Sequence, residues 1–394
     1  MTVLVIFACR KPNEHAAPTT LQGEMRDVYA VARKLYPYVW SPDAFLDQKN
    51  TAKISALLEQ LSNDFHKVEI AAPLTMFEPG FRVTLQTHRE MIKDIRDSFA
   101  KGDKEYANWK LRGLTANCVA CHSRYEVPVD FVGKLPVQLG QDFEAQMAQA
   151  EFLFATRQFD QASESLITLA VGEAKAVETS HHALQAIKLW LVIQVRVKNT
   201  YTSAAEKLTQ FLLAAQLTSD DRKLVERWIV DLNNFAGISA RGANLERART
   251  LLKPVAGQQL LTIDEENLIK TLYASSLLHQ ELLIDRAVKA SAGKLQPGNA
   301  DLRSRRQATY LLALAYFHLP IKTFDAFREL YLEQTIREFP HTREAERAFL
   351  MYQSYLEFQY SGSAGLNLDA KSQRRLQELR NLAFGNPSEV MISN

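Results

Sequence analysis

Apolar side chains recur at alternating steps of four and three residues through most of this chain, and that spacing constrains the fold more than any other feature. Residues spaced in this way lie along one face of an α-helix, which repeats every 3.6 residues. The 394 residues include only 15 Gly and 13 Pro, the residues that interrupt helices. A chain of this length usually needs more than one hydrophobic core. We therefore predict an all-α protein with two domains.

Residues 21–126 divide into four helical segments, each with its own apolar seam. The seams are Leu21, Met25, Val28, Ala32, Leu35 and Val39; Ile54, Leu58, Leu61, Phe65 and Val68; Phe81, Leu85, His88, Ile92, Ile95 and Phe99; and Ala107, Leu111, Leu114, Cys118, Cys121 and Tyr125. We expect Pro37 and Pro42 to mark the end of the first helix and Asp103 to cap the fourth. A repeat near 3.5 residues favours nearly parallel packing, so the segments predict an up-down-up-down bundle.

The string Cys118-Val119-Ala120-Cys121-His122 has the C-x-x-C-H pattern that is typical of covalent haem attachment. In a helix the two thiols lie on one side of a turn, so both can bond to one porphyrin. The adjacent imidazole can then bind the iron. We predict that Cys118 and Cys121 carry one haem c and that His122 is the proximal ligand of its iron.

A C-x-x-C pair also occurs in thiol redox enzymes and in zinc sites. A thioredoxin-like motif follows a strand in a βαβ unit, whereas this stretch has helical periodicity throughout. A zinc site needs further ligands, and the chain has three Cys and no second pair. Haem attachment is therefore the preferred interpretation. No group of residues near the motif predicts an enzyme.

Four helices with the motif in the last one resemble the cytochrome c prime and cytochrome c-556 family over roughly residues 20–130. The resemblance implies a four-helix bundle with the haem buried inside it. In c-556-like members a Met near the start of the first helix binds the distal face of the iron, and Met25 matches that position. The family often has a basic residue four positions after the haem His, where this chain has Glu126.

Antiparallel order brings the end of the fourth helix to the level of Met25, His66 and His88. Met25 is the preferred distal ligand. His88 is the second candidate, although it could instead bond a haem propionate or be a hydrogen-bonded core residue. His66 lies one step off its seam, and we expect it to be exposed. A five-coordinate iron, with no protein ligand on the distal side, is the remaining alternative.

The N-terminal segment 1–20 ends its apolar run at Ile6-Phe7-Ala8-Cys9, which resembles a bacterial lipobox with Cys9 as the lipidated residue. The run is short and no basic residue precedes it; a start codon further upstream would explain both features. The polar residues 10–20 are then a tether. Bacterial c-type haem is attached outside the cytoplasm, so the motif predicts a location on the periplasmic side of the envelope. Any contact with a membrane would occur through the lipid anchor.

Residues 127–140 break the helical pattern and predict a linker, and 141–394 are helical again. The spacing of Ala150, Leu153, Ala162 and Leu166 resembles a tetratricopeptide helix pair. A second match lies at 330–350, and weaker pairs lie between the two, such as 204–217 followed by 221–235. Such repeats stack into a solenoid whose concave face binds a protein or peptide. A non-repetitive helical domain is the alternative.

These features predict a periplasmic electron-transfer cytochrome whose helical repeats dock a redox partner protein. A Met/His iron suits electron transfer, whereas an open sixth position would bind NO or CO and indicate a gas sensor. An envelope scaffold is a third interpretation. The net charge of +2 and the absence of a basic, aromatic tract argue against a nucleic-acid partner.

Overall fold

The computed structural model describes most of the chain, namely residues 21–71, 79–123, 140–238, 244–253, 264–291, 299–362, 365–366 and 368–385. Over these ranges the protein is helical, apart from a short antiparallel pair formed by β1 (Ser361–Gly362) and β2 (Gly365–Leu366). The all-α prediction is confirmed.

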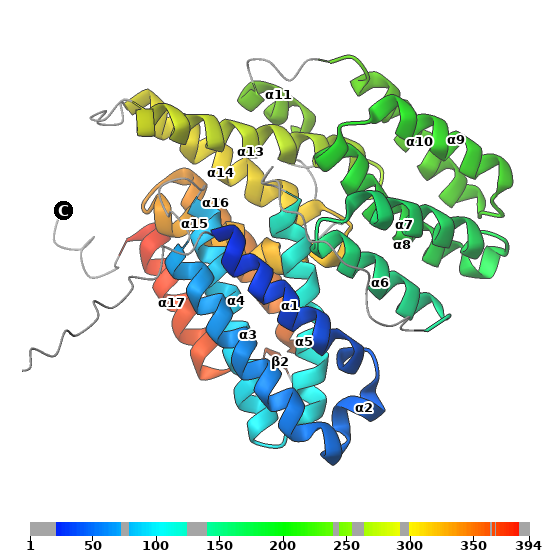
Figure 1. Ribbon diagram of the computed structural model, residues 1–394. Coiled ribbons are helices and arrows are strands. Elements are labelled where there is room, and N and C mark those ends of the chain that lie inside the picture. Colours follow the sequence, from blue (N-terminus) through cyan, green and yellow to red (C-terminus); the bar gives the residue numbers. More distant parts are fainter. Residues whose placement is uncertain are drawn as a thin grey trace, which may run out of the picture.

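The N-terminal part contains four long helices and two short ones between the first two of them (Figure 1). They are α1 (Leu21–Val39), α2 (Pro42–Leu46), the 3₁₀ helix η1 (Gln48–Asn50), α3 (Thr51–Ala71), α4 (Pro79–Ala100) and α5 (Lys104–His122). The long helices surround one cluster of buried apolar side chains between Val28 and Leu114, here called the bundle core. Seam residues from all four helices lie in it, including Val28, Leu58, Ile92 and Leu111.

The ends of these helices follow from local chemistry. Helix α1 ends at Val39, between Pro37 and Pro42 as expected, and it tolerates Pro37 because a Pro in the last turn removes only one backbone donor. Between α4 and α5 the chain reverses at Gly102, whose φ of +91° suits a residue without a Cβ. Asp103 then caps α5, as predicted, and its carboxylate accepts from the backbone N–H of Tyr106.

The remaining chain forms a longer series of helices. They are α6 (Phe143–Ala155), α7 (Phe159–Glu173), the 3₁₀ helix η2 (Val177–Thr179), α8 (Ser180–Val192), the π-helical segment η3 (Ile193–Lys198), α9 (Tyr201–Ala214), α10 (Ser219–Phe235), α11 (Asn244–Leu251), α13 (Leu268–Ser291), α14 (Asn299–His318), the 3₁₀ helix η4 (Lys322–Phe324), α15 (Asp325–Glu338), α16 (Arg343–Tyr360) and α17 (Ala370–Phe384). Helices that follow each other pack together in the pairs α6–α7, α9–α10 and α15–α16, where sequence spacing indicated helix pairs.

A second, larger cluster of buried side chains runs through this region and is here called the C-terminal core, defined by residues from Phe143 to Ala383 together with Val119 of α5. The four residues that carry the first predicted helix pair, Ala150, Leu153, Ala162 and Leu166, are all buried in it. Small residues at two of these positions allow α6 and α7 to approach closely.

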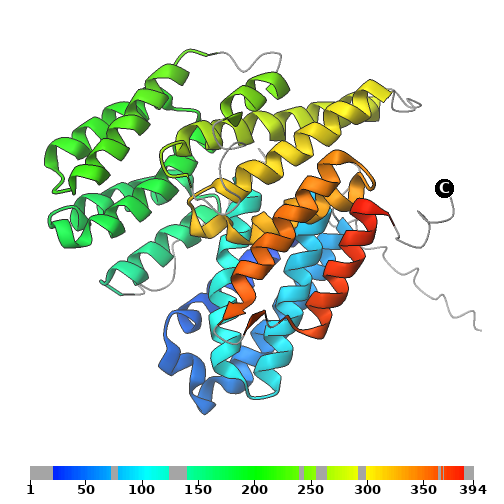
Figure 2. The ribbon, with the colours of Figure 1, turned by 180° about the vertical axis from the view of Figure 1, so that it is seen from behind.

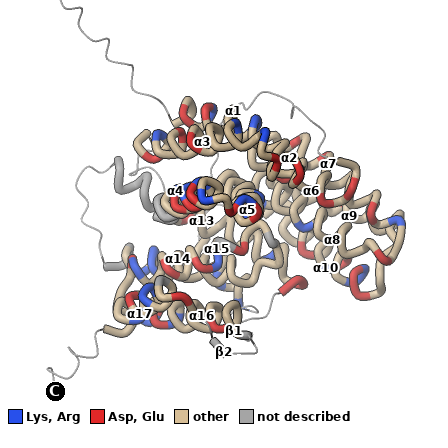
Figure 3. The backbone as a smooth tube through the Cα atoms, turned by 90° about the horizontal axis from the view of Figure 1, so that it is seen from below, with Lys and Arg blue, Asp and Glu red and all other residues tan. Residues whose placement is uncertain are grey.

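The two parts of the chain pack side by side. Helices α4 and α5 lie between the α1–α3 pair on one face and α14–α17 on the other (Figures 2 and 3). Contacts of α4 with α15, and of α5 with α6 and η4, join the two parts. The end of α5, which carries the C-x-x-C-H motif, therefore lies where both cores meet.

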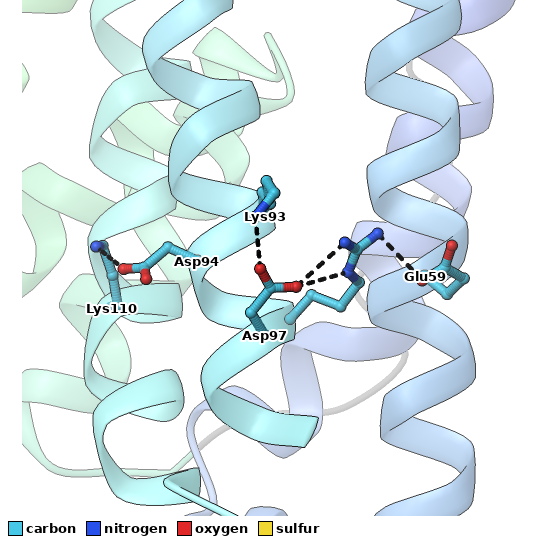
Figure 4. A network of polar contacts seen from close by, with 6 residues as sticks. Glu59, Lys93, Asp94, Asp97 and Lys110 are labelled. Atoms are coloured by element: carbon cyan, nitrogen blue, oxygen red, sulfur yellow. Dashed lines mark hydrogen bonds and ion pairs between the residues drawn. The ribbon is translucent and has the colours of Figure 1, made fainter. Parts of the chain in front are cut away.

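Charged side chains link α3, α4 and α5 on their outer faces (Figure 4). Asp97 accepts from Lys93 at 2.7 Å and from Arg96 at 3.1 Å, and Arg96 also reaches Glu59 of α3 at 3.3 Å. Asp94 pairs with Lys110 of α5. Such exposed pairs each contribute little, but they connect three helices of the bundle.

Candidate haem-binding site

Cys118, Cys121 and His122 lie in the last turn of α5, and Ser123 follows as its C-cap. Cys118 is half-buried against the C-terminal core, whereas Cys121 packs against the bundle core. The seam prediction placed both thiols on the bundle side. Cys118 also lines a cavity together with bundle-core residues such as Val28 and Leu114, so it lies between the two cores.

A cavity of about 690 Å³, counting the part that opens to solvent, adjoins this turn. Its lining comes from α1, α3, α5 and the end of α6, and comprises Met25, Val28, Tyr29, Ala32, Leu35, Tyr36, Val39, Leu61, Phe65, Leu111, Leu114, Thr115, Cys118, His122, Phe152, Ala155 and Thr156. This wall is almost wholly apolar. One of the motif cysteines, the motif His and the predicted distal Met all border it.

The imidazole of His122 is oriented by a backbone group. Its Nδ1 hydrogen-bonds the carbonyl oxygen of Ala155, the last residue of α6. A carbonyl only accepts, so Nδ1 carries the proton and the lone pair of the neutral ring is on Nε2. Metal-binding histidines commonly have this arrangement, in which a bond at one nitrogen fixes the tautomer for coordination through the other.

The environment of the cysteines argues against thiol redox catalysis. Burial, together with the nearby Cys121, raises the pKa of the Cys118 thiol to about 12. Reactive cysteines in C-x-x-C enzymes instead have lowered pKa values, because the thiolate is the nucleophile. In the part of the chain that the structure describes, no three His, Cys, Asp or Glu side chains gather as a metal site would require.

The three candidates for the distal ligand occupy different environments. Met25 of α1 lines the cavity together with His122. His88 is buried between α3 and α4, where its Nδ1 donates to the carbonyl of Thr84 at 2.7 Å and its ring stacks on Phe65 at 5.7 Å. His88 is not among the residues that line the cavity.

His66 has a side chain that is 61% exposed, and it lies 3.7 Å from the carboxylate of Glu69. Exposure of His66 was expected, and that prediction is confirmed. Of the three candidates, the geometry therefore brings only Met25 into the cavity with the motif.

Sequence reasoning did not identify Tyr36, Phe152, Ala155 and Thr156 as site residues. Tyr36 directly follows the seam residue Leu35 and has the same apolar character as the core around it. Phe152 and Ala155 belong to the helix pair that we assigned to the repeats. No local pattern marks a residue that reaches a site through tertiary packing across the linker.

Several predictions concern residues outside those described. They are the lipobox with Cys9, the tether, Tyr125 and Glu126 after the motif, and the linker 127–140 except for Gly140.

Comparison with protein-family models, with curated proteins and with solved structures gave no significant match. The case for this site therefore depends on its residues and geometry. Among the helices of the described ranges, none combines the length and the apolar character needed to cross a bilayer.

Proposed function

We propose that the chain is a c-type monohaem cytochrome that transfers electrons in the bacterial envelope. One observation carries the proposal: Cys118, His122 and Met25 border a single apolar cavity, although Met25 is more than 90 residues from the motif in sequence. Three features support a haem here. The cavity supplies an apolar wall bordered by Cys118, Cys121 lies three residues further along the same helix, and the imidazole has its ligating nitrogen fixed.

In this proposal each side chain has one task. Cys118 and Cys121 hold the porphyrin by thioether bonds, which consume both thiols. His122 binds the iron through Nε2 while the carbonyl of Ala155 orients its ring. Met25 is the ligand on the distal side. When bound with His and Met ligands, a haem iron has a raised reduction potential and exchanges electrons without binding a substrate.

The C-terminal helices serve as the docking region for a redox partner protein in this account. Support comes from three pairs of successive helices that pack together, namely α6–α7, α9–α10 and α15–α16. Stacked helix pairs present an extended surface for a protein or peptide. A periplasmic location, which follows from the haem motif, and attachment to lipid through Cys9, which follows from the lipobox, complete the proposal.

The visible spectrum of the reduced protein, recorded with and without CO, tests the electron-transfer role. A closed Met/His iron predicts low-spin bands that CO does not change. A high-spin spectrum that shifts with CO would contradict this role and would favour gas binding at an open sixth position.

A further inference from the structure

We propose that α6 forms part of the haem site. Its last turn positions His122, and its Phe152 forms one side of the cavity. The inference rests on the function proposed above. It goes beyond that function because it assigns the C-terminal region a part in the site itself, in addition to docking a partner.

The backbone carbonyls at the end of α6 explain why the His122 side chain bonds to this helix. The last four carbonyls of a helix lack partners within it. Three of these in α6 belong to Phe152, Leu153 and Phe154, and they accept from the backbone N–H groups of Thr156, Gln158 and Arg157, respectively. The fourth carbonyl, that of Ala155, accepts from His122 of the neighbouring region. The helix end and the imidazole therefore hold each other in place.

The turn that follows α6 is built to keep this carbonyl in position. The bonds from Gln158 to Leu153, at 2.8 Å, and from Arg157 to Phe154, at 2.9 Å, form a Schellman motif. Arg157 adopts a φ of +59°, a left-handed conformation that is normally left to Gly. A rigid end to α6 is what a positioning role requires.

Phe152 lines the cavity on the side where α6 meets the bundle, together with Ala155 and Thr156. Its ring is 3% exposed and lies 4.3 Å, between centroids, from the ring of Tyr36 on α1. The hydroxyl of Tyr36 donates to the carbonyl of Ala148, one turn earlier on α6. Helix α6 is thus joined to α1 beside the cavity and to α5 at the motif.

Position 154 on the same helix offers a matched control. Phe154 is fully buried like Phe152, but its ring faces Phe159 in the C-terminal core and does not line the cavity. Phe152→Leu and Phe154→Leu therefore remove similar buried rings from α6. Only the first change reaches the proposed haem pocket.

The test uses the full-length, haem-loaded protein with the Met25→Ala change, which opens the sixth position of the iron, and measures CO affinity after reduction. We expect Phe152→Leu to change this affinity by about tenfold or more, the effect typical of residues that support a metal ligand. Phe154→Leu should leave it within about twofold of the Met25→Ala parent, since Phe154 does not line the cavity and changes at independent sites rarely couple. Equal effects of the two variants would overturn the role of α6.

Hydrogen exchange provides a second measurement that does not depend on these variants folding. The wild type is compared with Cys118→Ser/Cys121→Ser, which cannot attach haem. Exchange of α6 amides should be about tenfold slower in the loaded protein, while α9, which does not line the cavity, should be unchanged. Equal exchange of α6 in both proteins would contradict the proposal. A wild type that contains no haem would instead refute the proposed function.

Discussion

Met25 and Met91 give the clearest comparison at the scale of single residues. Both side chains are half-buried against the bundle core, but only Met25 lines the cavity. Met91 instead accepts from the Nδ2 of Asn117 at 3.3 Å. A Met in such a position ordinarily fills space, and its neighbours decide whether it does more.

Met25→Ala should therefore open the sixth position of the iron and convert a low-spin spectrum into one that responds to CO. Met91→Ala is the control and should leave the spectrum as it is in the wild type. The measurement is the visible spectrum of each reduced variant, recorded with and without CO. An unchanged Met25→Ala spectrum would show that another group, or none, occupies the distal side.

Arg157 allows a prediction about backbone strain. Its φ of +59° is tolerated by Gly but costs a residue with a Cβ about 1 kcal/mol. Arg157→Gly and Arg157→Ala both remove the side chain, and only the Ala variant keeps the strain. We expect the Gly variant to be more stable than the Ala variant by about 1 kcal/mol in urea unfolding. The reverse order would mean that the left-handed turn is not formed.

At the scale of helices, the charged network on α4 predicts a dependence of stability on pH. Hydrogen bonds from Lys110 lower the pKa of Asp94, and those from Lys93 and Arg96 lower the pKa of Asp97. A lowered carboxyl pKa stabilises the folded state above the unfolded value near 3.9 and ceases to do so as the pH falls through the folded value.

The double variant Asp94→Asn/Asp97→Asn should accordingly melt below the wild type at pH 7. The difference in melting temperature should shrink as the pH falls below about 4 and vanish once both aspartates are protonated. Thermal unfolding monitored by circular dichroism between pH 7 and pH 2 measures this. A difference that stays constant over that range would rule out the ion pairs as its cause.

Helices of the N-terminal part were predictable because their seams are long and regular. Ile54, Leu58, Leu61, Phe65 and Val68 were assigned to one buried face, and all five are buried in α3. Capping by Asp103 was likewise evident, since a short acidic side chain before an apolar seam satisfies free N–H groups.

Contacts between the two parts could not be predicted in the same way. His122 bonds the backbone carbonyl of Ala155. Every residue has such a carbonyl, so the residue types in the sequence do not indicate which one His122 contacts. Phe152 is apolar like the repeat residues around it, so the sequence does not distinguish it from them. Whether it lines the cavity depends on how α6 packs against α1. Cys118 faces the C-terminal core for the same reason.

At the scale of the whole molecule, the two cores are joined by specific bonds between α6 and the bundle. Tyr36→Phe removes one of them, since the hydroxyl of this buried side chain donates to the carbonyl of Ala148. Losing this bond should lower the free energy of unfolding by roughly 0.5–1.5 kcal/mol, since the carbonyl of Ala148 inside α6 keeps its helical N–H donor. Tyr38→Phe, on the more exposed side of α1, is the control and should change it by less than about 0.5 kcal/mol. An equal fall in the free energy of unfolding for both variants would argue against a stabilising bond between Tyr36 and Ala148.

The mass of the mature protein and its pyridine haemochrome spectrum together show whether a haem is attached at Cys118 and Cys121. The protein is expressed together with the haem-attachment machinery, alongside Cys118→Ser/Cys121→Ser as the control. We predict that the wild type carries the added mass of one haem and a haemochrome of the c type, and that the control carries neither. A wild type without porphyrin mass would contradict the account and leave the cavity beside His122 without its proposed occupant.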